Sequence, residues 1–179
     1  MGGDRLRKGG IFLKKKIFSL LFAVILILLI LFAVLYTRPR TLLSLTGNPN
    51  PTPDFASTSS TTFFKDRDPQ TDRWQLSREQ LEDPAVRSEF MELAGSIQYR
   101  RSLRSLFRPN YLERDFQRIG TETSVNFKLP DGTYIRFDHL GTAVGIYRFG
   151  DEGYVLATVV NEEALAALSD YIIEIGEKD

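Results

Sequence analysis

The stretch SVNFKLPDGTYIRFDHLGTAVGIYRF, residues 124–149, alternates apolar and polar side chains with a period of two. This period is typical of β-strands that have one buried face. PDG at 130–132 suits a three-residue hairpin loop with Gly132 in the left-handed conformation. Leu140 and Gly141 suit a two-residue turn. The stretch therefore predicts three strands of an antiparallel meander.

These turns, and the loop GDEG at 150–153 that leads to a fourth strand at YVLATVV, set the pairing of the strands. The predicted partners are Phe127 with Ile135, Val125 with Phe137, Phe137 with Val144, Ile135 with Ile146, Ile146 with Ala157, and Val144 with Val159. All of these apolar side chains fall on one face. A slip of one residue would turn every side chain over, so the agreement among the turns favours a single buried face.

Helical signals precede the meander. LSREQL is a capping box, in which Ser77 is the N-cap and Gln80 occupies the third helical position. Pro84 suits the first turn of a second helix. Two more helical stretches are predicted, over 96–107 and 111–120.

A last helix follows the strands, with Asn161 as its N-cap and Gly176 at its end. The order of elements is therefore α–α–(α)–β–β–β–β–α. We expect residues 76–179 to form one α+β domain, in which helices pack on a four-stranded antiparallel β-meander with a C-terminal helix.

Residues 17–36, IFSLLFAVILILLILFAVLY, form an apolar run without a charge. A helix of this length spans roughly 30 Å, the thickness of the hydrocarbon core of a bilayer. The following residues, TRPR, give no small-residue pair for signal cleavage. We therefore predict an uncleaved transmembrane helix at 17–36, in preference to a removed signal or a buried core helix.

The charges that flank this run predict its orientation. Six basic residues precede it and two, Arg38 and Arg40, follow it closely. Because positive charge favours the cytoplasmic side, we expect residues 1–16 to be a basic cytoplasmic tail. The C-terminal domain would then be extracytoplasmic, on the cell membrane of a prokaryote.

Residues 37–75 connect the predicted membrane helix to the predicted domain, and they are rich in Pro, Ser and Thr. Such a composition offers little to bury and is typical of an extended linker. Trp74, near its end, is expected to dock on the domain. The sequence leaves open whether Phe63 and Phe64 dock there or enter the membrane interface.

Composition excludes several functions. The 179 residues contain 23 basic and 23 acidic side chains, one histidine and no cysteine. The domain is acidic overall, which argues against nucleic-acid binding. We expect no cofactor, no metal and no enzyme activity, because no glycine-rich phosphate loop or catalytic motif is found. His139 is predicted to be a surface residue in a turn.

The first candidate surface is a row of arginines on the predicted helix over 96–107 and just beyond it. Its members are Arg100, Arg101, Arg104 and Arg108. They would form a cationic face for anionic lipid headgroups, an anionic polymer or an acidic partner. The alternative is that these arginines pair internally with the acidic C-terminal region, residues 150–179.

The second candidate surface is the face of the sheet opposite to the apolar one. It would carry Tyr134, Arg136, Tyr147 and Tyr154, with Gly145 opposite Arg136 leaving space above it. Tyrosines around an arginine give a large contact area at low entropic cost, as in recognition surfaces. The alternatives are that a helix covers this face or that the tyrosines simply cap the edge of the sheet.

The leading hypothesis is a single-pass membrane protein whose extracytoplasmic domain is a protein-interaction or assembly subunit of a membrane or envelope complex. Its partners would be the bilayer, through residues 17–36, and at least one protein. The alternative hypothesis is an extracytoplasmic sensor or a module that binds a ligand or polymer, with a pocket lined by Tyr134, Arg136 and Tyr147. The sequence does not indicate an oligomeric state.

Overall fold

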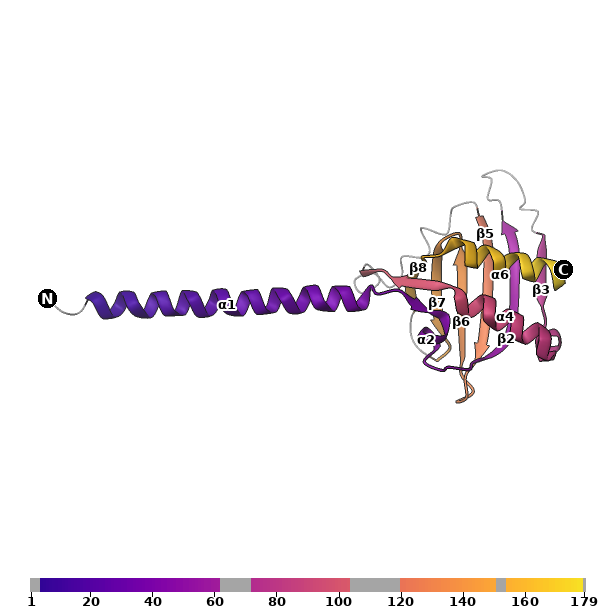
Figure 1. The fold of residues 1–179 in the computed structure, drawn as a ribbon, viewed down its shortest axis with the longest axis horizontal. Coiled ribbons are helices and arrows are strands. Elements are labelled where there is room, and N and C mark those ends of the chain that lie inside the picture. Colours follow the sequence, from indigo (N-terminus) through magenta and orange to yellow (C-terminus); the bar gives the residue numbers. More distant parts are fainter. Residues whose placement is uncertain (1–3, 62–71, 104–119, 151–153, 179) are drawn as a thin grey trace. The chain divides into compact units, whose positions relative to one another are not determined.

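The computed structural model describes residues 4–61, 72–103, 120–150 and 154–178 (Figure 1). Its backbone groups into two compact units, Met1–Arg38 and Pro39–Asp179. The first unit consists of helix α1, Asp4–Tyr36. The segment Lys16–Tyr36 is long and apolar enough to cross a membrane by length and composition, and its large hydrophobic side chains are exposed. The helix begins at Asp4, so most of the predicted basic tail is helical and continuous with the apolar segment.

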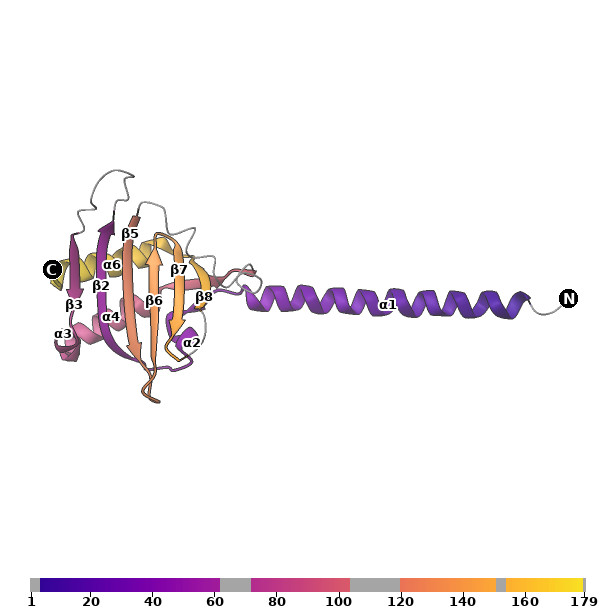
Figure 2. The same ribbon diagram turned by 180° about the vertical axis from the view of Figure 1, so that it is seen from behind.

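The second unit is built on an antiparallel sheet with the strand order β1-β4-β8-β7-β6-β5-β2-β3-β9 (Figures 1 and 2). The nine strands found in the described residues are β1 Arg40–Thr41, β2 Thr52–Thr61, β3 Arg73–Leu76, β4 Gln98–Arg101, β5 Gly120–Lys128, β6 Tyr134–Leu140, β7 Ala143–Arg148, β8 Tyr154–Val159 and β9 Glu177–Lys178. The α+β class is confirmed, but the predicted four-stranded sheet was wrong. The meander β5–β8 is extended on both sides by strands that the sequence did not reveal.

The described helices of this unit are α2 Leu42–Thr46, α3 Arg78–Glu82, α4 Pro84–Ser96 and α6 Glu162–Ile175. Helices α4 and α6 cross the same face of the sheet (Figure 1). Phe90 of α4 and Leu168 and Ile172 of α6 are fully buried in one core with the apolar side chains of the sheet. We call the face under these helices the inner face and the opposite one the outer face.

The predicted starts of α3, α4 and α6 are confirmed, but the side chain at the N-cap of α6 makes no capping hydrogen bond. Ser77 and Gln80 form the capping box of α3, and the Asp83 side chain accepts a hydrogen bond from Ala85 N at the start of α4. Asn161 stands at the N-cap position of α6, but its side chain makes no cap bond. Its Oδ1 accepts from Gln98 N at 2.7 Å, and its Nδ2 donates to Ser96 O at 2.9 Å. Asn161 thus joins the end of α4 to the start of β4.

The register of the first hairpin is as predicted, because Val125 pairs with Phe137 and Phe127 with Ile135. The next turn lies one residue later, at Gly141 and Thr142, with Leu140 paired to Ala143. The observed partners in β6–β7 are therefore Phe137 with Ile146 and Ile135 with Arg148. In β7–β8, where the next loop sets the register, Val144 pairs with Ala157 and Ile146 with Val155. Each pairing is shifted by two residues from the prediction. A shift of two keeps every side chain on its predicted face, so the single buried face is correct.

The predicted linker over 37–75 was wrong in its structured parts. It contains α2, β2 and the start of β3, and β2 lies between β5 and β3 within the sheet. Ala56 and Thr58 of β2 point inward and are buried, although neither is large. Small side chains here let α6 pack close to the strand, whose backbone is satisfied by its neighbours. Trp74 packs against the core as expected, while Phe63 and Phe64 lie outside the described residues.

The predicted helix over 96–107 was also wrong over 98–101, where the chain forms strand β4. Helix α4 ends at Ser96, and β4 pairs with β8 through Tyr99 and Val159. Burial of Tyr99, which is 1 % exposed, and backbone pairing at the free edge of β8 outweigh the local helical preference. The predicted helix over 111–120 lies outside the described residues except for Gly120, which begins β5.

Candidate functional site

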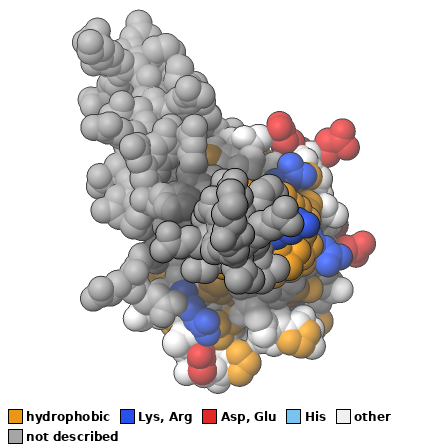
Figure 3. All heavy atoms as spheres, turned by 90° about the vertical axis from the view of Figure 1, so that its left-hand side faces the viewer, with side chains coloured by type: hydrophobic (Ala, Val, Ile, Leu, Met, Phe, Trp, Pro, Cys, Tyr) orange, Lys and Arg blue, Asp and Glu red, His pale blue; other side chains and the backbone are white. Residues whose placement is uncertain are grey.

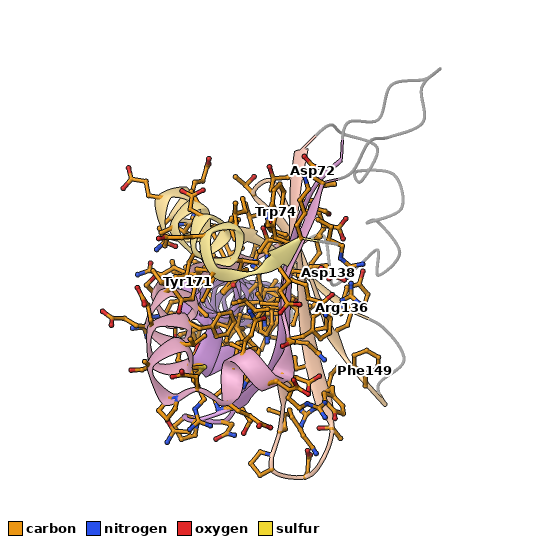
Figure 4. All side chains as sticks on the ribbon, turned by 90° about the vertical axis from the view of Figure 1, so that its right-hand side faces the viewer. Asp72, Trp74, Arg136, Asp138, Phe149 and Tyr171 are labelled. Carbon is orange, nitrogen blue, oxygen red and sulfur yellow. The ribbon has the colours of Figure 1, made fainter. Side chains whose placement is uncertain are left out.

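The outer face of the sheet is the surface on which the structure gathers most of the predicted recognition residues. Arg136, Asp138 and Phe149 lie on the side of the sheet away from the helices (Figure 4). In the part of the chain that the structure describes, no helix covers this face (Figure 2). The alternative of a covering helix is therefore not supported by these residues.

A hydrogen-bonded cluster of three side chains lies at the centre of the outer face. The register places Asp138 of β6 opposite Ser124 of β5. Asp138 Oδ1 accepts from Arg136 Nε at 2.6 Å and from Ser124 Oγ at 2.6 Å. The guanidinium also contacts Ser124 Oγ through Nη2 at 3.4 Å. Asp138 is largely shielded, whereas Arg136 is about one-third exposed, so the pair presents mainly a fixed guanidinium to solvent.

A second cluster lies beside the first, around Asp54 at the bulge of β2. Asp54 Oδ1 accepts from Arg78 Nε at 2.8 Å, and Oδ2 accepts from Asn126 Nδ2 at 3.2 Å. The hydrogen bond with Asp54 raises the pKa of Arg78. Asn126 is paired with Arg136 across β5 and β6, so the two clusters are adjacent. The Asn126 Oδ1 atom is buried and has no hydrogen-bond partner among the described residues.

A half-buried acid adjoins the clusters. Glu122 lies on the outer face of β5, opposite Leu140 of β6. Burial raises the pKa of Glu122, and the nearby carboxylate of Asp138 adds to the shift. Both effects disfavour the charged carboxylate.

Aromatic side chains form one end of the outer face. Tyr134 and Phe149 meet edge to face with ring centroids 6.4 Å apart, and Phe149 N donates to Tyr134 O at 2.9 Å. Phe149 is 55 % exposed. Sequence reasoning missed this residue, although it follows Tyr147 by two positions and therefore continues the same face. Tyr154 pairs with Tyr147 in the register, but its side chain lies outside the described residues.

The structure thus brings Tyr134, Arg136 and Tyr147 together on one face as predicted. The predicted position of Gly145 was wrong, because the turn before β7 lies one residue later. Gly145 is opposite Asp138, and Tyr147 is opposite Arg136. The residue without a Cβ therefore lies opposite the carboxylate and not opposite the guanidinium.

Arg100 and Arg101, the described members of the predicted arginine row, do not lie on a helix. Arg100 and Arg101 are consecutive residues of strand β4, so their side chains point to opposite faces of the sheet. Arg104 and Arg108 lie outside the described residues. Figure 3 shows acidic and basic side chains close to one another, rather than in separate patches.

His139 is not a surface residue, because the later turn leaves it inside β6 on the inner face. It is fully buried, its Nδ1 lies 2.8 Å from Thr123 O, and its Nε2 lies 2.9 Å from Tyr99 Oη. A carbonyl oxygen can only accept, so Nδ1 carries the hydrogen and Nε2 accepts from the Tyr99 hydroxyl. Burial lowers the pKa of His139 to about 4 and raises the pKa of Tyr99. The pair is therefore neutral and structural at physiological pH.

A groove of about 370 Å³ lies on the inner side of the sheet, between α6, the start of β5 and the β6–β7 turn. It is separate from the outer face. Its residues are mostly hydroxylic or apolar, with two carboxylates, Glu162 and Asp170. The described residues contain no cluster of three histidine or acidic side chains suited to hold a metal ion.

Comparison of the chain with protein-family models, with curated proteins and with solved structures gave no match.

Proposed function

We propose that the chain is a single-pass membrane protein whose C-terminal domain docks a protein partner through the outer face of its sheet, as an assembly subunit of a membrane or envelope complex. The observation that carries this proposal is the ordered outer face itself. It combines two fixed charge clusters with the ring pair of Tyr134 and the exposed Phe149, and no described helix covers it.

The chemistry of this face suits a protein surface. Phe149 and Tyr134 are rigid aromatic groups of the kind that anchor protein interfaces. Arg136 is held by Asp138 and Ser124, and its Nη1 has no hydrogen-bond partner among the described residues. A preorganised guanidinium loses little side-chain entropy when it binds. The expected partner presents an apolar pocket for the aromatic end and a carboxylate or carbonyl oxygen for Arg136.

The membrane side of the proposal follows from α1. This helix is apolar enough to span a bilayer, and the flanking basic residues favour a cytoplasmic N-terminus.

The experiment is site-specific photocrosslinking of the full-length chain in its native membranes. A photoreactive phenylalanine analogue at position 149 probes the outer face. The same analogue at Ala167, an exposed position of α6, is the control. We expect one reproducible protein adduct from position 149 and none of that adduct from position 167.

Variants of the outer face then test the interface itself. Tyr134→Ala combined with Tyr147→Ala should reduce the adduct at least several-fold, whereas the two Tyr→Phe changes should retain most of it. The docking proposal fails if positions 149 and 167 give the same products, or if the double alanine variant crosslinks like the parent.

The alternative function, a module that senses or binds a ligand, is favoured by a different observation. The register places Tyr134, Arg136 and Tyr147 on the outer face of the sheet, whereas the groove beside α6 is concave. A ligand-binding function therefore finds better support in that groove than in the three residues named from the sequence.

A further inference from the structure

Helix α6 carries two stripes of side chains, one in the core and one along the groove, and Leu165 and Ser169 of the groove stripe are themselves partly or largely buried. Leu168, Tyr171 and Ile172 enter the core. The other stripe faces the groove and consists of Glu162, Leu165, Ala166, Ser169, Asp170 and Ile173. Its members recur at i, i+3, i+4, i+7, i+8 and i+11, which places them along one side of the helix for three turns.

The floor of the groove offers hydrogen-bond acceptors. Ser169 Oγ donates to Leu165 O at 2.9 Å, so it accepts from Thr123 Oγ1, which lies 2.8 Å away. The hydroxyl hydrogens of both residues are thereby committed inside the protein. Thr123 is 2 % exposed and its Oγ1 also lies 3.1 Å from Thr58 Oγ1, so the acceptor capacity that remains for a ligand is chiefly the second lone pair of Ser169 Oγ. A ligand that donates hydrogen bonds fits this floor better than one that accepts them.

The charge of the groove also favours a ligand that donates hydrogen bonds, and in particular a cation. Glu162 and Asp170 line it, and the lining residues include no lysine or arginine. Neither carboxylate forms an ion pair with a residue that the structure describes. They are eight residues apart on α6, about 12 Å along the helix axis. Leu165 and Ile173 add apolar surface, and Ile173 is 38 % exposed.

We propose that this groove binds an elongated organic cation of the alkyl diamine or polyamine class. One ammonium group would lie near Glu162 and the other near Asp170, with the alkyl chain against Leu165 and Ala166. The volume of about 370 Å³ lies at the lower end of the range for small-molecule sites. This inference gives the alternative function a site and a ligand class, and it does not depend on docking at the outer face.

The test is calorimetric titration of the full-length protein, in nanodiscs of neutral phosphatidylcholine, with 1,8-diaminooctane. Neutral lipid is used because a dication also binds anionic headgroups. The uncharged 1,8-octanediol has the same chain length and serves as the ligand control. We expect saturable binding of one diamine per chain and no binding of the diol.

Two adjacent alanines of α6 provide matched variants. Ala166 lines the groove and Ala167 does not, and both are exposed. Ala166→Phe should abolish binding by filling the groove, whereas Ala167→Phe should leave it unchanged. Glu162→Gln and Asp170→Asn are isosteric surface changes, and each should weaken binding by about two- to five-fold.

The proposal is overturned if the diamine does not bind, if the diol binds equally well, or if Ala166→Phe and Ala167→Phe behave alike. Should Ala166→Phe disturb folding, the two isosteric variants decide the matter, since unchanged affinity in both contradicts the carboxylate contacts. Crosslinking from position 149 is measured separately, so failure of this site and failure of the docking proposal are distinguishable.

Discussion

Tyr99 and His139 are hydrogen-bonded to each other in the core, Oη to Nε2 at 2.9 Å, although 40 residues separate them in the chain. The bond joins β4 to the central meander across β8 and β7. It also fixes the histidine as the neutral tautomer that donates through Nδ1 to Thr123 O. The consequence is a dependence of stability on pH.

We expect the protein to lose stability on acidification because of His139. Its pKa is about 4 in the folded state and about 6.5 when unfolded, so the unfolded chain binds the proton more readily. The stabilisation from the neutral histidine is present above pH 6.5 and falls progressively as the pH drops to about 4. The total loss is on the order of 3 kcal/mol. Thermal melting of the full-length protein between pH 7.5 and pH 5 measures the effect.

The control for this prediction is His139→Gln, which keeps a neutral polar side chain. This variant should be less stable at pH 7.5 but should show a shallower fall between pH 7.5 and pH 5. An equally steep fall in both proteins would assign the pH dependence to other groups.

The second prediction concerns two glycines, Gly176, where an added Cβ would clash with backbone, and Gly95, where it would fit. A Cβ added at Gly176 would lie 2.3 Å from Ile172 O and 3.2 Å from Gln75 O. Gly176→Ala must therefore displace backbone between α6 and β9, and we expect it to destabilise the fold by about 1–3 kcal/mol. Melting temperatures of the variant and the parent provide the measurement.

Gly95 is the matched comparison. It lies within α4, and an added Cβ would meet only Leu43 Cδ1 at an ordinary 3.7 Å. Gly95→Ala should stabilise the protein by about 0.5–1 kcal/mol, because alanine loses less backbone entropy in a helix. If both variants shift the melting temperature in the same direction, the contact geometry assigned to Gly176 is wrong.

The third prediction compares the two partners of Asp54, the buried Asn126 and the exposed Arg78. Asp54→Ala leaves the buried Asn126 without a partner for Nδ2, in addition to its unpaired Oδ1. The cost of an unsatisfied buried amide group is about 1–3 kcal/mol. Arg78→Ala removes a side chain that is 61 % exposed and leaves the bond between Asp54 and Asn126 intact, so its effect should be small.

The double change Asp54→Ala with Asn126→Ala tests this explanation. It removes the stranded amide, so it should recover part of the stability that Asp54→Ala loses. Equal losses from Asp54→Ala and Arg78→Ala would show that the salt bridge, and not the buried amide, is the stabilising element.

The parts of the fold that the sequence could reveal are those with a local signal. The PDG loop and the period-two pattern at 124–149 were sufficient for the meander and its buried face. A turn placed one residue early at Leu140 shifted the β6–β7 pairings by two residues, and the β7–β8 pairings were shifted by two residues at the next loop; neither shift can change a face. The turn at Leu140 did misplace His139, whose position after Ile135 and Phe137 already matched the buried face.

Other features depend on contacts that no local pattern encodes. Strand β2 carries mostly serine, threonine and alanine, with Pro53 near its start, so it lacks the apolar alternation of a half-buried strand. It forms because β5 and β3 satisfy its backbone on both sides. The Asp54 cluster was missed for the same reason, since Arg78 and Asn126 are 24 and 72 residues away in the chain.

The last prediction follows from the position of β2. A fragment of residues 76–179 contains the whole domain predicted from the sequence, but it lacks α2, β2 and most of β3. It would expose the edge of β5 and leave β9 without its partner strand. An unpaired central strand edge is a template for aggregation. We therefore expect this fragment to be insoluble or to melt without cooperativity.

A fragment of residues 39–179 contains the complete second unit and should be monodisperse, with a cooperative melting transition. Size-exclusion chromatography and circular dichroism of the two fragments decide between the boundaries. A 76–179 fragment that melts as cooperatively as 39–179, at the same temperature, would show that β2 adds nothing to the core. That outcome would support the prediction from the sequence that residues 37–75 are a linker outside the folded domain.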